Sequence, residues 1–486
     1  MRKQTKLVAV LSAAALLAIG ASMTSFAAQG WAEEDGTWVY YDKDGDRVTD
    51  TWKKSGTQFF YLNWDGEMAT STLIEDDSDK YYVDENGAKV TNRWVSLDNE
   101  DDVQVNGEDV DTIWYYFDGN GKAVKGDSIK NKTINGKKYF FDTDGYMMSG
   151  WYEEDKSSGG TETYYLGDEN EGWAYTDWHS LEPKDSDAEA YDDTEWFYFA
   201  SSGKAKKNTR AYINKKYYAF DEQGVMKNKW IVGTPPKADG AYYNADVGYQ
   251  ETGWVYVYEK NEDRTINEDG DEKWFYLDSK GVAFNDEGKQ AGASASTATK
   301  RDGDGWEGTA KTKVAAKVVK SKTYLFDNTG RMLTGVYDID GVERTGSSSD
   351  LDGIYYFNTG SGSVEGQMMT GKQTINFDGD SYYYSFDKSG KAYVNSIADG
   401  CLYNKDGVRV NAEDGNNYRL VYVGDTDDNV IGPVSVKGKV SVKIGNGDVL
   451  VVNKGGKVKQ SGKVRIDGYE YVVEGYKAQL PGKPID

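Results

Sequence analysis

The sequence predicts an all-β protein, a solenoid of stacked β-hairpins, and three observations support this prediction. Aromatic residues make up 14% of the 486 residues and hydrophobic residues only 38%, so the apolar surface is held in rings spread along the chain. Glycine occurs 56 times and proline only 6 times, which favours many tight turns. Pairs of aromatic residues recur ahead of glycines that are 21 residues apart where the spacing is cleanest, at Gly45, Gly66 and Gly87.

The stretch G-T-W-V-Y-Y-D-K-D-G-D-R-V-T-D-T-W at residues 36–52 shows the repeat in full. Side chains alternate across a strand, so Trp38 and Tyr40 share one face while Val39 and Tyr41 share the other. The Asp-Gly, Asn-Gly and Ser-Gly pairs that follow such runs supply the positive φ of a tight hairpin turn. A single hairpin is marginally stable, so we expect each hairpin to bury its rings against the next.

The chain is predicted to divide into five segments. Residues 1–27 have a basic start, an apolar run and a small-residue exit, as in a secretory signal peptide. No second long apolar run follows, so we expect a secreted protein without membrane insertion that attaches to a surface non-covalently. The other segments are residues 28–285, Trp-rich β-hairpin repeats; 286–321, a low-complexity linker or long loop; 322–410, Tyr/Phe hairpin repeats; and 411–486, a short-strand β region that forms a cap or a separate small β domain.

The charge balance narrows the class of partner. The net charge at pH 7 is −24, and a surface of this sign repels nucleic acid and anionic membranes. It attracts a cationic group and tolerates a neutral sugar. We therefore expect no nucleic-acid partner.

The residue types needed for common catalytic and metal sites are scarce. The chain has one histidine, His179, and one cysteine, Cys401, which argues against catalytic triads and zinc sites. The motif D-K-D-G-D at Asp42–Asp46 does not continue as a calcium-binding EF-hand loop, so we interpret it as an ordinary turn. The sequence thus predicts a protein that is not an enzyme, with no metal and no cofactor.

The segments G-W-A-E-E-D-G-T-W-V-Y-Y-D-K-D-G, K-K-Y-F-F-D-T-D-G-Y-M-M-S-G-W and K-T-Y-L-F-D-N-T-G-R-M-L-T-G resemble the choline-binding or cell-wall-binding repeat of secreted Gram-positive proteins. That family is related to the glucan-binding repeats of streptococcal glucosyltransferases. The resemblance implies ligand sites between consecutive hairpins, each an aromatic cage that holds a trimethylammonium group by cation–π attraction.

Four cages follow from the resemblance when it is applied residue by residue. Each combines the tryptophan near the Gly-Trp position with the aromatic strand of the next hairpin. These are Trp31 with Trp38 and Tyr40, Trp94 with Trp114 and Tyr116, Trp178 with Trp196 and Tyr198, and Trp254 with Trp274 and Tyr276. Trp52 with Phe59 and Tyr61, Trp151 with Tyr164, and Trp230 with Tyr242 match the pattern less well.

The function predicted on this basis is a secreted, non-catalytic cell-surface binding protein. Its aromatic sites would dock on cell-wall polymer, either choline-bearing teichoic acid or glycan. One alternative is an adhesin that binds host or extracellular glucan, with a host glycan or protein as partner. A second alternative is a protein associated with a cell-wall hydrolase.

Overall fold

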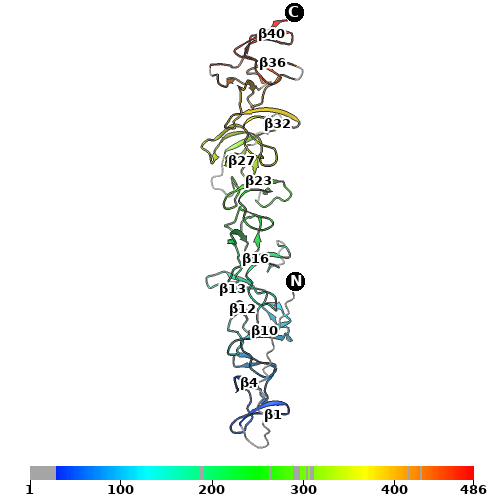
Figure 1. The fold of residues 1–486 in the computed structure, drawn as a ribbon, viewed down its shortest axis with the longest axis vertical. Helices are drawn as coiled ribbons and strands as arrows, with labels where there is room; N and C mark the ends of the chain where they lie inside the picture. The colour runs from blue at the N-terminus through cyan, green and yellow to red at the C-terminus, as the bar shows by residue number, and fades with distance from the viewer. Residues whose placement is uncertain are drawn as a thin grey trace. The chain divides into compact units, whose positions relative to one another are not determined.

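The computed structural model describes residues 29–184, 191–261, 264–287, 296–302, 305–306, 311–413, 416–426, 429–439 and 441–485. These residues form short β-strands joined by turns and contain no helix, and so no helix that could cross a membrane (Figure 1). The all-β prediction is confirmed. The predicted signal peptide, residues 1–27, lies outside the described residues.

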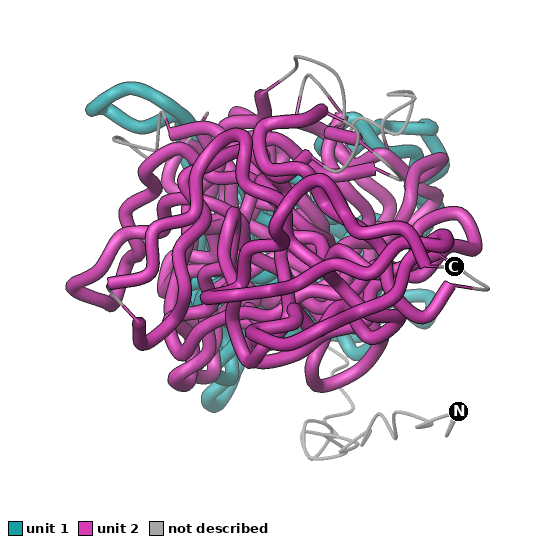
Figure 2. Tube along the Cα trace, turned by 90° about the horizontal axis from the view of Figure 1, so that it is seen from above, with its two compact units in different colours: residues 1–178, 198–205 teal, residues 179–197, 206–486 magenta. Residues whose placement is uncertain are grey.

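The chain divides into two compact units, coloured separately in Figure 2. Unit 1 comprises Met1–Trp178 and Tyr198–Ala205, and unit 2 comprises His179–Phe197 and Lys206–Asp486. The division falls within strands β15 (Asp177–Leu181) and β16 (Glu195–Phe199). It therefore lies inside residues 28–285, which the sequence predicted to be one continuous series of repeats.

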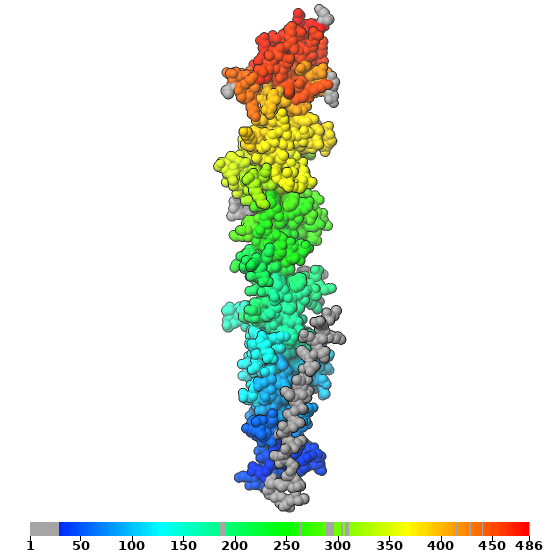
Figure 3. Space-filling model, in the orientation of Figure 1, coloured from blue at the N-terminus to red at the C-terminus, as the bar shows by residue number. Residues whose placement is uncertain are grey.

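Unit 1 consists of two-stranded antiparallel hairpins, one of which lies within the loop of another (Figure 1). Figure 3 colours the atoms of this unit from blue through cyan in chain order. The pairs are β1 (Gly30–Glu34) with β2 (Thr37–Tyr41), β3 (Thr51–Ser55) with β4 (Gln58–Leu62), β5 (Thr72–Asp76) with β6 (Asp79–Val83), β7 (Arg93–Asp98) with β10 (Thr112–Phe117), β8 (Gln104–Val105) with β9 (Glu108–Asp109), β11 (Lys130–Ile134) with β12 (Lys137–Phe141), and β13 (Trp151–Asp155) with β14 (Thr161–Tyr165).

The turn that closes each hairpin is not the one that the sequence predicted. The first hairpin closes at Asp35 and Gly36, whose φ angles of 52° and 84° are those of a type I′ turn. The predicted turn glycine, Gly45, follows the hairpin, in a loop closed by a single bridge between Tyr41 and Arg47. The prediction was wrong here because the repeat contains two glycine turns of similar sequence, and only the first has long strands on both sides.

The second turn is held by the side chain three residues before its glycine. Asp42 accepts hydrogen bonds from the backbone N–H groups of Asp44 and Asp46, both at 2.9 Å. The acidic turn motifs are therefore accounted for by backbone hydrogen bonds. The same pair of bonds, to the second and fourth residues onward, is made by Asn63, Asp84, Asp118, Asp142, Asp221, Asp278, Asp327, Asp387, Asn404 and Asn453.

Successive hairpins are joined at one position, which we name the post-turn position: the residue two after the second-turn glycine. Its backbone N–H donates to a carbonyl of the preceding hairpin, as Met147 does to Trp114 at 2.8 Å. Its side chain packs on the turn glycine of the next repeat, where a Cβ added to Gly172 would lie 2.2 Å from Sδ of Met147. Glycine is therefore required at this turn both for its φ of +64° and for the space that the neighbour fills.

Unit 2 begins with similar hairpins and continues with larger sheets. Its strands are β17 (Thr209–Ile213), β18 (Lys216–Phe220) and β19 (Met226–Lys227); β20 (Lys229–Trp230) with β21 (Tyr242–Tyr243); β22 (Gly253–Tyr258) with β23 (Glu272–Leu277); the eight-stranded sheet of β24 (Thr297–Asp302), β25 (Gly305–Trp306), β26 (Thr312–Val319), β27 (Lys322–Asp327), β28 (Met332–Leu333), β29 (Gly335–Val342), β30 (Arg344–Thr345) and β31 (Leu351–Phe357); β32 (Gly371–Phe377) with β33 (Asp380–Phe386); β34 (Ser396–Ala398), β35 (Cys401–Tyr403) and β37 (Ser435–Val436); β36 (Tyr418–Tyr422) with β38 (Val449–Asn453); and β39 (Gly462–Ile466), β40 (Tyr469–Glu474), β41 (Lys477–Ala478) and β42 (Lys483–Pro484).

The region predicted to be a linker, residues 286–321, contributes β24 and β26 to the eight-stranded sheet. Ala298 and Ala316 are buried against Leu325 and Ile339, so small residues are needed there for packing. The prediction was wrong because a composition of Ala, Ser and Thr is common both in flexible linkers and in closely packed strands. Because these side chains are small, the strands that carry them can pack closely.

The C-terminal region shares a core with the hairpin that precedes it. Ile397 and Leu402 cluster with Val421, Val434 and Leu450, and β34 pairs in parallel with β37. The described residues of 411–485 thus pack directly on the preceding hairpin.

Candidate ligand sites

Five aromatic rings from two successive hairpins of unit 1 form a cluster, which we name the Trp94 site. Trp94 lies on β7, opposite Tyr116 of β10 in the strand ladder. Ring centroids lie 5.1 Å from Trp94 for Tyr116 and 6.4 Å for Trp114. The next hairpin supplies Tyr139 at 4.8 Å and Phe141 at 5.8 Å, the latter with planes only 24° apart. The central indole thus has rings around it from both hairpins.

The same arrangement occurs in unit 2, as the Trp254 site. The central ring of Trp254 lies 5.2 Å from Tyr276 and 6.2 Å from Trp274, both on β23. The following hairpin contributes Tyr324 at 4.7 Å and Phe326 at 5.8 Å, with planes 23° apart. Each distance agrees with its counterpart in the Trp94 site to within 0.2 Å. Two parts of the chain that are far apart in sequence therefore have the same arrangement of rings around a central tryptophan.

A carboxylate lies beside each site. Trp274 donates its indole N–H to Oε2 of Glu365 at 3.1 Å. In the Trp94 site, burial raises the pKa of Tyr139, and the negative charge of Glu171 raises it further. Both glutamates directly precede the glycine on which the post-turn methionine packs. The negative charge favours a cationic ligand over a neutral one.

Neither central ring is covered by a cation of the described residues, and we call such a site open. Within the described residues, no lysine or arginine lies over the ring of Trp94 or Trp254. Cations do lie over peripheral rings: Nζ of Lys317 is 5.6 Å from the centroid of Tyr276 and 4.7 Å from that of Phe284 at the Trp254 site, and Nζ of Lys137 is 2.9 Å from that of Trp173, which packs beside Tyr139. Electron-rich ring faces beside a carboxylate suit a quaternary ammonium group, which offers no N–H to donate.

The predicted cages at Trp94 and Trp254 do come together, although not across two hairpins as the resemblance implied. Trp94, Trp114 and Tyr116 all lie on one hairpin, as do Trp254, Trp274 and Tyr276. The rings contributed by the next hairpin are Tyr139 and Phe141 in unit 1 and Tyr324 and Phe326 in unit 2. None of the four was predicted to belong to a site. Their spacing in the sequence could have identified them. The tyrosine of each pair stands six residues, and the phenylalanine four residues, before a second-turn glycine.

The predicted cage at Trp31 is incomplete in comparison. Trp31 lies 5.4 Å from Tyr40 on its own hairpin and 5.4 Å from Phe60 on the next. Trp38 is half-buried and lies opposite Glu33 in the strand ladder. Nζ of Lys53 is 5.1 Å from the Tyr40 centroid.

Two rings of the predicted cage at Trp178 come together within unit 1. Trp178 and Tyr198 have ring centroids 5.1 Å apart. Trp196 is 49% exposed, so its ring presents a surface to solvent. Among the lesser matches, Trp230 is buried, donates its N–H to the carbonyl of Tyr258, and lies 3.9 Å from Nζ of Lys260, which makes it a core residue.

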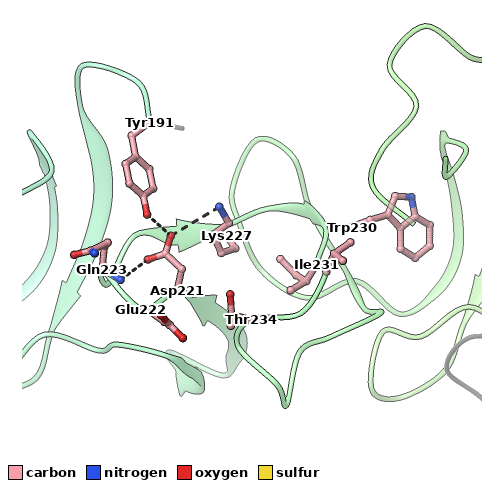
Figure 4. A pocket seen from close by; sticks show the side chains of 9 residues that line it. Tyr191, Asp221, Glu222, Gln223, Lys227, Trp230, Ile231 and Thr234 are labelled. Atoms are coloured by element: carbon pink, nitrogen blue, oxygen red, sulfur yellow. Dashed lines mark hydrogen bonds and ion pairs between the residues drawn. The ribbon is translucent and has the colours of Figure 1, made fainter. Parts of the chain in front are cut away.

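A surface hollow in unit 2 is lined by Asp221 and its neighbours (Figure 4). Its central polar group is Asp221, which accepts hydrogen bonds from Tyr191 at 3.1 Å and from the backbone of Gln223 at 3.0 Å. Lys227 lies 3.8 Å from the same carboxylate. Because Asp221 is engaged by its own turn and its neighbours, we place no ligand in this hollow.

Comparison with known families identifies the repeat. Residues 109–123 and 132–147 match the family described as putative cell wall binding repeat. These two segments contain four of the five rings of the Trp94 site. The predicted resemblance to this repeat is confirmed.

Two curated relatives are glucosyltransferases of streptococci. Glucosyltransferase-S of Streptococcus mutans is 26% identical over 189 residues, which are 38% of this chain and 11% of that protein. Glucosyltransferase-I of Streptococcus downei is 26% identical over 314 residues, which are 63% of this chain and 15% of that protein. The chain thus spans a small part of the length of either relative.

Solved structures with similarity to this chain come from Streptococcus pneumoniae. The modular autolysin LytC in complex with a synthetic peptidoglycan ligand is 17% identical, with 63% of this chain and 52% of that chain covered and a TM-score of 0.35. Choline binding protein F is 20% identical, with 79% and 100% covered and a TM-score of 0.22.

Proposed function

From a chain that carries cell wall binding repeats, we propose a cell-surface binding protein whose Trp94 and Trp254 sites hold the quaternary ammonium of choline on a wall polymer. The observation that carries this proposal is the repeated five-ring geometry, with its adjacent glutamate, in both units. In this proposal the protein is non-catalytic and is held on the surface without a covalent bond.

Each site alone would bind weakly. A cation over one aromatic ring gains roughly 0.5 to 2 kcal/mol, so three ring faces correspond to roughly millimolar dissociation constants. Two sites on one chain engage a polymer that carries many choline groups, and the second contact is then intramolecular. Binding to the wall is therefore expected to be much tighter than binding to free choline.

Titration of tryptophan fluorescence with choline chloride tests the proposal. We expect choline to cause a saturable change in the fluorescence of the intact protein. The amplitude of this change should be smaller in Tyr139→Leu and in Tyr324→Leu, and the double variant should show no fluorescence response to choline. Tyr212→Leu is the matched control, because Tyr212 is exposed and lies outside both sites. Absence of a saturable response, or an unreduced response in the folded double variant, would contradict the proposal.

A second candidate ligand is glucan, stacked on exposed rings. Trp64 is 79% exposed and Trp196 is 49% exposed, and flat open rings of this kind suit the apolar face of a sugar. The similarity to glucosyltransferases adds support to this candidate. If glucan binds at these rings, tryptophan fluorescence should respond to soluble glucan. The double variant Trp64→Ala, Trp196→Ala should lose this response and keep the response to choline.

A further inference from the structure

A third cluster of rings, which lies in unit 1, occupies the same positions of the repeat as the Trp94 and Trp254 sites. Trp52 of β3 lies 5.1 Å from Tyr61 on its own hairpin and 5.2 Å from Tyr81 on the next. Phe59 stands seven residues before a second-turn glycine, as Trp114 does. We name this cluster the Trp52 site. Tyr61, Tyr81 and Phe59 stand where the Trp94 site has Tyr116, Tyr139 and Trp114, while Val83 stands where it has Phe141. The rings that remain can still hold a cation.

The Trp52 site is occupied by a side chain of the protein. Nζ of Lys89 lies 4.7 Å from the centroid of Phe59, 5.2 Å from that of Trp52 and 5.3 Å from that of Tyr81. The ammonium is thus nearly equidistant from three rings that belong to two hairpins. Distances of this size are those of cation–π contacts.

Lys89 holds the post-turn position of its repeat. Met147 holds that position at the Trp94 site, and Met332 holds it at the Trp254 site. The alignment is fixed by the turn glycines, since each of these residues stands two after a glycine and eight after the facing tyrosine. Lysine therefore stands at the Trp52 site where methionine stands at both open sites.

The backbone and stem of Lys89 are held in place independently of its charge. Its N–H donates to the carbonyl of Phe59 at 2.8 Å. A Cβ on Gly121 would lie 3.0 Å from Cδ and Cε, so the stem packs on that turn. Within the part of the chain that the structure describes, no carboxylate forms an ion pair with Lys89. Burial lowers its pKa, which the negative charge of Asp118 opposes.

We propose that Lys89 is a built-in ligand whose ammonium takes, at the Trp52 site, the place that an external quaternary ammonium takes at the Trp94 and Trp254 sites. The identity of that external group rests on the proposed function. The residue at the post-turn position then decides whether a set of rings is open or closed. Lysine closes the site from within, and methionine leaves the central tryptophan ring without a cation over it.

The position of Lys89 is tested without any ligand. In the full chain labelled with carbon-13 at lysine Cε, the resonance lost in Lys89→Met identifies this residue. We expect its Cε protons to be shifted upfield by ring currents, relative to those of Lys43, which is exposed. A Lys89 resonance at the position of a free lysine would overturn the proposal.

The opening and closing of the site are tested by counting bound choline in equilibrium dialysis of the full chain. We expect Lys89→Met to add one site and Met147→Lys to remove one, while Lys43→Met leaves the number unchanged. Unchanged numbers in both folded variants would overturn the proposal. If Lys89→Met does not fold, Met147→Lys decides the same question at the equivalent position.

The two proposals fail in different ways. If the intact protein binds no choline, the proposed function fails, and the Lys89 resonance still decides whether the ammonium sits among the rings. If choline binds but neither substitution changes its number, the proposed function stands and the internal ligand is overturned. Far-UV circular dichroism and the thermal midpoint of each variant establish that it is folded.

Discussion

The indole N–H of Trp274 donates a 3.1 Å hydrogen bond to the carboxylate of Glu365, although 91 residues separate the two in sequence. This bond fixes a negative charge at the edge of the Trp254 site. It also orients an indole ring that faces Trp254. The charge and the ring geometry of the site therefore depend on the same contact.

Replacement of Glu365 by glutamine is expected to weaken choline binding at the Trp254 site. The amide oxygen still accepts the indole N–H, but the Coulomb attraction to the ligand is lost, at a cost of about 1 kcal/mol or roughly fivefold in affinity. The measurement is a choline titration in a Tyr139→Leu background, in which only the Trp254 site reports. Glu343→Gln is the control, and an equal loss in that exposed variant would point to a general charge effect.

Replacement of Gly172 by alanine is expected to destabilise unit 1 more than a positive φ alone explains. Gly159 has a φ of +87° and open space around it, so Gly159→Ala measures the backbone cost, about 1 to 2 kcal/mol. At Gly172 the new methyl also meets Met147, which adds roughly 1 to 3 kcal/mol. Urea unfolding of both variants gives the comparison, and Met147→Ala should relieve part of the Gly172→Ala loss. Equal midpoints for the two alanine variants would contradict the contact.

Alkaline pH is expected to destabilise unit 1, in part through Tyr61. Burial, followed by the 2.5 Å hydrogen bond to Asp50, raises the pKa of Tyr61 to about 12. Above pH 10 the unfolded chain releases this proton while the folded chain keeps it, so the free energy of unfolding falls as pH rises from about 10 to 12. Urea midpoints between pH 8 and pH 11 measure this slope. The slope should be smaller in Tyr61→Phe, and an unchanged slope would rule out this tyrosine as a source.

Removal of the turn carboxylate at Asp142 is expected to loosen the Trp94 site. Asp142 accepts the N–H groups of Asp144 at 2.9 Å and Tyr146 at 2.8 Å, directly before Met147. Asp142→Ala leaves both donors without this acceptor and should cost roughly 1 to 2 kcal/mol of stability. Asp142→Asn keeps an acceptor oxygen and should remain close to the unsubstituted protein. Thermal midpoints of the two variants measure the difference, and equal losses would mean that charge, not hydrogen bonding, holds the turn.

The repeat architecture could be predicted from the sequence because rings and glycines recur at regular spacing. Strand pairing could not be predicted with the same success. Asp35-Gly36 and Asp44-Gly45 are nearly identical in sequence, yet only the first closes a hairpin. The choice depends on hydrogen bonds between hairpins, such as that from Met68 to the carbonyl of Trp38 at 2.7 Å, which no local pattern reveals.

The candidate sites were predicted in part for a related reason. The rings of Trp94 and Tyr116 were recognised because they match a family pattern, and both lie on one hairpin. Tyr139 was not, because an aromatic residue looks the same in sequence whether it lines a site or fills a core. The occupant Lys89 was missed because its distance to Trp52 depends on how two hairpins pack.

The post-turn position has a consequence for how such chains change over generations. Lysine and methionine can be encoded by AAG and ATG, which differ in one nucleotide. A single point mutation at this codon exchanges an internal cation for a neutral side chain and leaves every ring and every hairpin turn in place. A lineage can therefore vary how many sites its copies expose, and so how strongly they hold a polymeric surface, without rebuilding the fold.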